Sequence, residues 1–333
     1  MASNATKKDS RVRVAVIGAG NMGKNHLRNY KEMPEADLVG IADINPATKK
    51  LADEQGIKYF SDYREMLDKL KPEAVSIVVP TPFHAEVATA ALERGSHCLV
   101  EKPIASTVAE ADALISLAKK RGLVFTVGHI ERYNPVVRQL KKLVDEKKIG
   151  EITSIVSKRV GGFPSVEPKT DVIIDLAVHD IDIISYLLGE QPHTVHSHGS
   201  RTHHTQKVDS AEILMKYSKA SGFVQANWLT PVKIRTIALT GSLGYLEANY
   251  INQELHWYRH NMEKLGDFTK FVQKLGAPVK EILQVSFQEP LAVELRTFLQ
   301  HVRGDKSDKL VEPTDAREAL RLALESIRPY ETA

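Results

Sequence analysis

Gly18, Gly20 and Gly23 follow a valine-rich run and open a helix-like stretch, in the order RVAVIGAGNMGKNH. In this spacing the first glycine allows a tight turn, the second lets the main chain approach a pyrophosphate, and the third lets helix and strand pack closely. The first helical turn, which includes Asn21 and Met22, would offer amide donors and the positive end of the helix dipole. The sequence therefore predicts a strand, a phosphate-binding turn and a helix.

Apolar runs alternate with amphipathic stretches from residue 11 to residue 128. The runs RVRVAVIG, ADLVGIAD, AVSIVVP, HCLVEK and LVFTVG are rich in Val and Ile, which is typical of parallel strands that are buried on both faces. We therefore expect an α/β fold with an N-terminal Rossmann domain, a doubly wound parallel sheet, over residues 11–128. Residues 1–10 have no apolar core of a signal peptide and are expected to be a flexible leader.

The pattern changes after the helical stretch that ends near Gly150. Segments such as EITSIVSKRV, SGFVQANWL and KIRTIALTG alternate apolar and polar residues by twos. This predicts a C-terminal α+β domain with a large, mostly antiparallel sheet over residues 129–333. Such a sheet cannot hide Leu214, Phe223, Trp228 and Ile237 within one chain, so we expect a homodimer or homotetramer that forms through it.

The composition of the chain limits the kinds of binding partner and the cellular location that we expect. The chain has 45 Lys and Arg against 42 Asp and Glu, so it has no charge excess of the kind that favours nucleic acid. No apolar run approaches the roughly 20 residues of a membrane-spanning helix. Cys98 is the only cysteine, so no disulfide can form within the chain, and a cytoplasmic location is expected.

An acidic residue follows the glycine turn at the spacing that ribose recognition requires. Asp43 ends the run ADLVGIAD, 20 positions after Gly23. Its carboxylate can accept both ribose hydroxyls and would repel a 2′-phosphate, which favours NAD over NADP. Lys49 and Lys50 leave some use of NADP open. The alternative is an ordinary glycine turn without a dinucleotide.

Two further turns lie at the carboxyl ends of expected strands, where open α/β sheets bind ligands. After AVSIVV, Pro80 and Thr81 could line the nicotinamide ribose, while His84 could touch the cofactor or face solvent. After HCLV, the chain reads EKP, so that Lys102 is either a solvated surface charge or a catalytic one.

The stretch IIDLAVHDIDII places Asp175, His179 and Asp182 four and three residues apart. On an α-helix these residues share one face, and Asp180 turns away from it. A histidine flanked by carboxylates is suited to act as a general base. The alternatives are a helix that satisfies its own polar groups and a metal site, but no third ligand is evident, so no metal is predicted.

The glycine loop, the Glu101–Pro103 segment and the helix with Asp175, His179 and Asp182 occur in this order. Together they resemble the glucose-fructose oxidoreductase and inositol dehydrogenase (Gfo/Idh/MocA) family over nearly the whole chain. The resemblance implies that Lys102 and His179 flank the nicotinamide and that Asp175 helps to hold the substrate. Lys102 would then be catalytic.

Within this family, four segments resemble the UDP-N-acetylglucosamine 3-dehydrogenases more than the inositol or glucose enzymes, namely GHIERYNP, KRVGGFP, IIDLAVHDIDI and NWLTPVKIRTIALTG. One departure from the family pattern is that Thr170, Asp171 and Val172 replace the usual glycine-rich lead-in to the catalytic helix. A diphosphate needs cationic or amide donors, and a uracil can stack on an aromatic ring. The candidate substrate residues, each of which could instead be a sheet-surface residue, are Tyr133, Asn134, Arg159, Lys169, Trp228, Lys233 and Arg235.

We therefore expect NAD-dependent oxidation of a sugar hydroxyl to a ketone, at C3 of UDP-N-acetylglucosamine. His179 would be the base, Lys102 the polarising cation and Asp175 the orienting group, while Glu101, near the cofactor, would hold Lys102. One alternative is an inositol or free-sugar dehydrogenase with the same groups. Another is a non-catalytic dinucleotide sensor, which would need the glycine loop alone.

Overall fold

The computed structural model describes residues 11–165, 167–203, 206–259 and 279–330 of the chain. The described residues form two compact units. One comprises those of Met1–Ile130 and Glu289–Arg317, and the other those of Glu131–Gln288 and Glu318–Ala333. A division into two successive domains at residue 128 stays a prediction. The two compact units differ from it because Glu289–Arg317 belong to the first unit.

The first unit contains a six-stranded, all-parallel sheet in the order β3-β2-β1-β4-β5-β6, which confirms the doubly wound prediction. Its strands are β1 (Val12–Ile17), β2 (Ala36–Ala42), β3 (Lys58–Phe60), β4 (Ala74–Ile77), β5 (His97–Glu101) and β6 (Phe125–Gly128). Its helices include α1 (Asn21–Glu32), α2 (Thr48–Gln55), α3 (Tyr63–Leu70), α4 (His84–Glu93), α5 (Val108–Arg121) and α9 (Pro290–Val302). The strand order reverses at β1, where such sheets bind ligands at their carboxyl ends.

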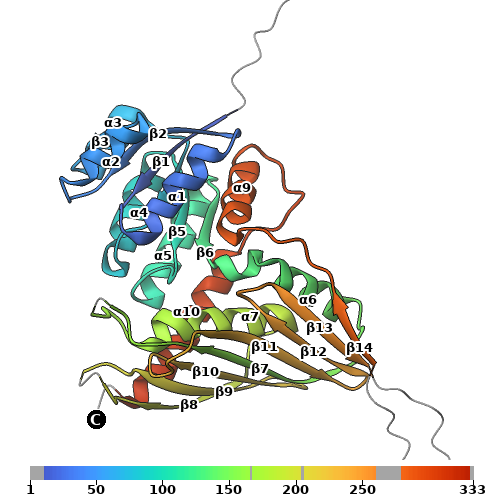
Figure 1. Cartoon of the computed structure of the whole chain (residues 1–333). Coiled ribbons are helices and arrows are strands. Elements are labelled where there is room, and N and C mark those ends of the chain that lie inside the picture. Colours follow the sequence, from blue (N-terminus) through green and yellow to red (C-terminus); the bar gives the residue numbers. More distant parts are fainter. Residues whose placement is uncertain (1–10, 166, 204–205, 260–278, 331–333) are drawn as a thin grey trace, which may run out of the picture. The chain divides into compact units, whose positions relative to one another are not determined.

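Helix α9 packs beside α1 although it lies far along the chain (Figure 1). Its buried residues Leu291, Leu295, Phe298 and Leu299 join the core cluster that contains Leu27 of α1. Their spacing of roughly 3.6 residues puts them on one helical face. This burial explains why α9 belongs to the first unit, which the sequence pattern alone did not predict.

The second unit contains an eight-stranded sheet in the order β14-β13-β12-β11-β7-β10-β9-β8. Only the pair β7 and β10 is parallel, so the predicted, mostly antiparallel sheet is confirmed. Its strands are β7 (Ile152–Val160), β8 (Thr194–Ser200), β9 (Ser210–Lys216), β10 (Ser221–Asn227), β11 (Ile234–Gly241), β12 (Gly244–Asn249), β13 (Glu254–Arg259) and β14 (Val279–Leu283). Its helices include α6 (Pro135–Asp145), α7 (Val178–Leu188) and the end of α10 (Pro313–Ile327).

Helices α6 and α7 lie along one face of this sheet (Figure 1). The opposite face carries Val156 and Leu214, which are 46% and 48% exposed and flank Phe223 in the strand register. Ile237 and Trp228, expected on that open face, are instead buried. Along β11 the buried residues Ile237 and Leu239 alternate with Ala238 and Thr240, so the side chain of Ile237 points to the face that carries the helices. Association of subunits through the open face stays a prediction.

Candidate active site

The glycine turn of the first unit has the geometry that its sequence predicts. Gly18 has a φ of +99°, and a Cβ there would lie 2.6 Å from the carbonyl oxygen of Val78. A Cβ on Gly23 would lie 2.0 Å from the carbonyl oxygen of Gly18. In contrast, no described atom outside the adjoining chain lies within 4 Å of a Cβ on Gly20. The turn thus requires two of its glycines for packing, while the third leaves the main chain open where α1 begins at Asn21.

Asp43 is held against this turn. Its Oδ2 accepts the N–H of Ala19 at 2.5 Å, and its Oδ1 accepts the N–H of Asn45 at 2.7 Å. Each carboxylate oxygen has a further lone pair for a hydroxyl donor. Lys49, which left NADP open, pairs with Asp53 at 2.7 Å. The open glycine turn and the fixed carboxylate beside it therefore fit the diphosphate and ribose of NAD.

His84 ties together the turns that follow β4 and β5. Its Nδ1 lies 2.8 Å from the carbonyl oxygen of Pro103, and its Nε2 lies 2.8 Å from that of Val79. The side chain is buried, so the alternative that it faces solvent is wrong. Burial lowers the pKa of His84 overall, while the two carbonyl oxygens act in the opposite direction, because only a ring that carries both protons can donate to both. A contact with the cofactor stays a prediction, as it does for the neighbouring Pro80 and Thr81.

Lys102 follows β5 and is half-buried, with a cis peptide bond to Pro103. Its main-chain N–H donates to Oε2 of Glu101 at 3.2 Å. Glu101 is only 8% exposed. Burial alone would raise the pKa of Glu101, but the hydrogen bond from His26 and the charges of His26 and Lys102 lower it overall. An ionised carboxylate therefore lies at the base of the Lys102 segment.

Three residues around Glu101 were not predicted from the sequence. His26, on the buried face of α1, places Nε2 3.0 Å from Oε1 of Glu101. Gly128 leaves room for that carboxylate, since a Cβ there would lie 3.0 Å from Oε1. Glu294 of α9 is 1% exposed, and in the described part of the chain its carboxyl oxygens have no hydrogen-bond partner. Only His26 had a local signal, its place three residues after Gly23 in the glycine loop.

The segment with Asp175 and His179 is not one continuous α-helix. Ile173–Ala177 form a π-helical turn, in which the N–H of Val178 reaches back to the carbonyl oxygen of Ile173, and α7 begins at Val178. Single π-helical turns within α-helices are frequent at functional sites. Asp175 and His179, on either side of the junction, are both half-buried.

Asp182 does not continue this half-buried set. It is 2% exposed and accepts two hydrogen bonds from Arg132, at 2.8 Å from Nε and 2.6 Å from Nη2. Asp180, expected to turn away, is fully buried and binds Arg159. Both carboxylates thus tie α7 to the rest of its unit, because buried charges require partners.

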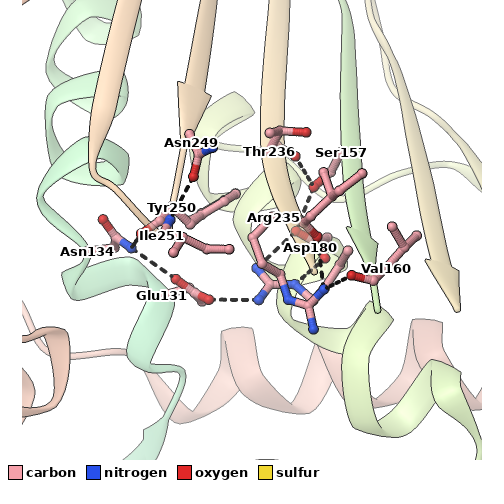
Figure 2. A network of polar contacts seen from close by, with 12 residues as sticks. Glu131, Asn134, Ser157, Val160, Asp180, Arg235, Thr236, Asn249, Tyr250 and Ile251 are labelled. Atoms are coloured by element: carbon pink, nitrogen blue, oxygen red, sulfur yellow. Dashed lines mark hydrogen bonds and ion pairs between the residues drawn. The ribbon is translucent and has the colours of Figure 1, made fainter. Parts of the chain in front are cut away.

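The buried network of Asp180 and Arg159 extends to Glu131. Figure 2 shows Asp180 and Glu131 within this network. Arg159 donates from Nε to Asp180 at 2.6 Å and from Nη1 to Glu131 at 2.7 Å. Ser157 also donates to Asp180, at 2.6 Å. Burial lowers the pKa of Arg159, but Asp180 and Glu131 raise it overall, so the guanidinium charge is matched within the unit. Binding of phosphate by Arg159 stays a prediction.

The other candidate substrate residues are in contrasting environments. Asn134 caps α6 and donates to the carbonyl oxygen of Tyr250 at 3.2 Å (Figure 2). Tyr133 is buried, with the Arg138 guanidinium 5.2 Å from its ring centre. Trp228 is buried edge-on to Phe163 at 6.1 Å. Lys169 and Lys233 are exposed. Arg235 lies in the network of Figure 2.

Among residues 11–165, 167–203, 206–259 and 279–330, no three His, Cys, Asp or Glu side chains are grouped so that they could hold a metal ion. Over the same residues, no helix is both long enough and apolar enough to cross a membrane.

A parallel sheet of this order, with its glycine turn and the carboxylate of Asp43, is typical of dinucleotide-binding proteins. In this chain it is accompanied by a second unit built on a mostly antiparallel sheet. The chain belongs to the Gfo/Idh/MocA family. The family model described as "Oxidoreductase family, NAD-binding Rossmann fold" matches residues 12–129, and the model of the family's C-terminal domain matches residues 137–247. The chain is therefore an oxidoreductase with NAD as its cofactor.

Relatives in this family act on different substrates. The chain is 29% identical to the UDP-N-acetylglucosamine 3-dehydrogenase of Acidithiobacillus ferrooxidans, over 89% of this chain and 90% of the relative. It is 28% identical to the scyllo-inositol 2-dehydrogenase (NAD(+)) of Bacillus subtilis, over 90% and 88%. A solved structure of the former enzyme has a TM-score of 0.84 and 27% identity, and the match covers 97% of this chain and 98% of that one.

Proposed function

We propose that this protein oxidises a hydroxyl-bearing ring carbon of a sugar to a ketone, and that its substrate is UDP-N-acetylglucosamine, oxidised at C3. The observation that carries the proposal is the Lys102 segment, which follows β5 in the NAD-binding unit and is anchored on a buried, ionised Glu101. A similar enzyme, related over most of both chains, carries this activity in its name. The resemblance of four sequence segments to such enzymes supports the same choice.

The proposed chemistry removes a hydride from carbon and a proton from its hydroxyl group. When bound, NAD supplies the hydride acceptor. His179 takes the hydroxyl proton as general base, and Asp175 orients the sugar or His179. Lys102 donates to the hydroxyl oxygen, which lowers its pKa and stabilises the negative charge that develops before the carbonyl forms. Glu101 fixes the main chain of Lys102.

A second candidate uses the same groups on a free polyol. It is favoured by the similarity to an inositol dehydrogenase at nearly the same identity and coverage. A dinucleotide sensor without catalysis is disfavoured, because such a protein would not need Lys102, Asp175 and His179 together.

The test is reduction of NAD by the purified protein, followed as absorbance of the reduced nicotinamide. UDP-N-acetylglucosamine is compared with UDP-glucose, glucose and myo-inositol. Reduction with the acetylated nucleotide alone supports the proposal, and identification of a 3-keto product by NMR fixes the carbon. Reduction with myo-inositol or glucose alone moves the function to the polyol candidate.

A further inference from the structure

Two arginine side chains meet in the second unit, on the sheet face that carries α7. Arg235 of β11 is directly opposite Arg159 of β7 in the antiparallel register. Directly opposed residues of antiparallel strands point to the same side of a sheet. Asp180 and Glu131 are both bound to Arg159, so the charge of that arginine is matched by two carboxylates.

Arg235 has no carboxylate partner among the described residues. Its Nη1 donates to the carbonyl oxygens of Val160 at 2.5 Å and Ile234 at 2.9 Å (Figure 2). Over the part of the chain that is described, its Nε and Nη2 make no hydrogen bond. Those two nitrogens form the edge of the guanidinium that can donate two parallel hydrogen bonds to one oxyanion. The side chain is half-buried, and the two bonds of Nη1 hold the guanidinium in place.

The electrostatic surroundings leave this charge under-compensated. Burial and the like charge of Arg159 lower the pKa of Arg235, although Asp180, Glu131 and Asp175 act in the opposite direction. A buried or half-buried charge in such a position gains from a bound counter-charge. Asp175, the candidate catalytic carboxylate of the same unit, is thus one of the groups that raise the pKa of Arg235.

Space is open beside Nη2. A Cβ built on Gly161 would lie 4.0 Å from Nη2 of Arg235, and no other described atom outside the adjoining chain would lie within 4 Å of it. Gly161 follows β7 directly and is itself buried. A ligand group of a few atoms could therefore reach the guanidinium edge at this point.

We propose that Arg235, beside Gly161, binds an anionic group of the sugar substrate, either a phosphate of a sugar nucleotide or the carboxylate of a sugar acid. This inference rests on the proposed function and narrows it, because a neutral polyol would leave the arginine unmatched. Arg235 would thereby select charged sugars over inositol or glucose. Its role is binding, while proton and hydride transfer are assigned to other groups.

The experiment compares the full-length NAD-loaded protein with its Arg235→Gln and Gly161→Val variants. Binding of UDP-N-acetylglucosamine, N-acetylglucosamine 1-phosphate, glucuronate and neutral N-acetylglucosamine is measured by calorimetry. The Gln variant removes the charge, whereas the Val variant keeps Arg235 and fills the space beside it. Arg259→Gln, which removes an exposed arginine from β13 of the same sheet, is the matched control.

We expect both site variants to weaken binding of at least one anionic ligand about tenfold or more, as for a lost charged hydrogen bond. Binding of the neutral sugar and of NAD should be unchanged, and the control should behave as wild type. If only binding of the phosphate-bearing ligands weakens, the anion is a phosphate, and if only binding of glucuronate weakens, it is a carboxylate. Unchanged binding, or equal weakening for neutral and anionic sugars, overturns the inference. If glucuronate binding depends on Arg235 but UDP-N-acetylglucosamine is not oxidised, the anion site stands and the proposed substrate falls.

Discussion

Nε2 of His26 lies 3.0 Å from Oε1 of Glu101, and the two side chains are 0% and 8% exposed. The pair joins the helix that follows the glycine turn to the strand that ends at Glu101, directly before Lys102. Because the carboxylate also accepts the main-chain N–H of Lys102, the position of the lysine depends on a histidine that the proposed mechanism does not use. His26 is thus a positioning residue.

Replacement of His26 by Ala should lower kcat about tenfold or more and leave the Kd for NAD within about threefold. The hydrogen bond from His26 lowers the pKa of Glu101. Without it that pKa rises, so activity that needs the ionised carboxylate should be lost at a higher pH than in wild type. The acid limb of the kcat profile measures this shift, and His26→Gln, which keeps a donor, should restore part of it. A decrease in kcat that is the same at every pH would show that His26 has only a general structural role.

Lys102→Met should lower kcat about a hundredfold or more, as for a lost donor to a developing oxyanion. The Kd for NAD should change little, because the glycine turn and Asp43 lie on other segments of the unit. Single-turnover kinetics and NAD titration give the two quantities. Lys69→Met, at an exposed helix position in the same unit, is the control. Wild-type turnover in Lys102→Met would remove the lysine from the mechanism.

The parts of the site that could be predicted are those fixed by local backbone demands. Gly18 and Gly23 are required by contacts within the turn itself, and Asp43 by its spacing from them. Glu294 could not be predicted as a neighbour of Glu101, because it lies on α9, a helix that joins the first unit only through tertiary packing.

The helix with the catalytic candidates shows a second limit of the sequence. A constant period of 3.6 residues placed Asp175, His179 and Asp182 on one face, whereas the structure has a π-helical turn over Ile173–Ala177, which contains Asp175, and α7 begins only at Val178. Asp180 and Asp182 are alike in sequence, and only the positions of Arg159 and Arg132 determine which carboxylate each arginine binds.

Glu294 should make stability depend on pH. Burial and the charge of Glu101 raise its pKa well above the ordinary value of 4.5. The folded protein then keeps a proton that the unfolded chain releases, so the contribution to stability is full below pH 4.5 and is lost as pH rises toward the folded-state pKa. The side chain of Glu294→Gln is neutral at every pH. Its free energy of unfolding should therefore exceed that of wild type by about 1–3 kcal/mol at high pH and should not exceed it at low pH.

Urea unfolding of both proteins at about pH 5 and about pH 8 gives the comparison for Glu294→Gln. The exposed Glu32→Gln on α1 is the control and should follow wild type at both pH values. A gain for Glu294→Gln that is equal at the two pH values would show that the effect is not proton-linked.

The open face of the eight-stranded sheet should mediate association of subunits. Val156, Phe223 and Leu214 are adjacent across β7, β10 and β9 on the face opposite α6 and α7. Such apolar clusters on a broad sheet are commonly covered by a second copy. Leu214→Glu would place a charge at the centre of the contact and should convert dimer or tetramer to monomer without lowering the melting temperature of the isolated chain. Light scattering after size exclusion measures the mass, with Lys142→Glu at an exposed position of α6, on the opposite face of the sheet, as control. An unchanged oligomer in Leu214→Glu would place the interface elsewhere.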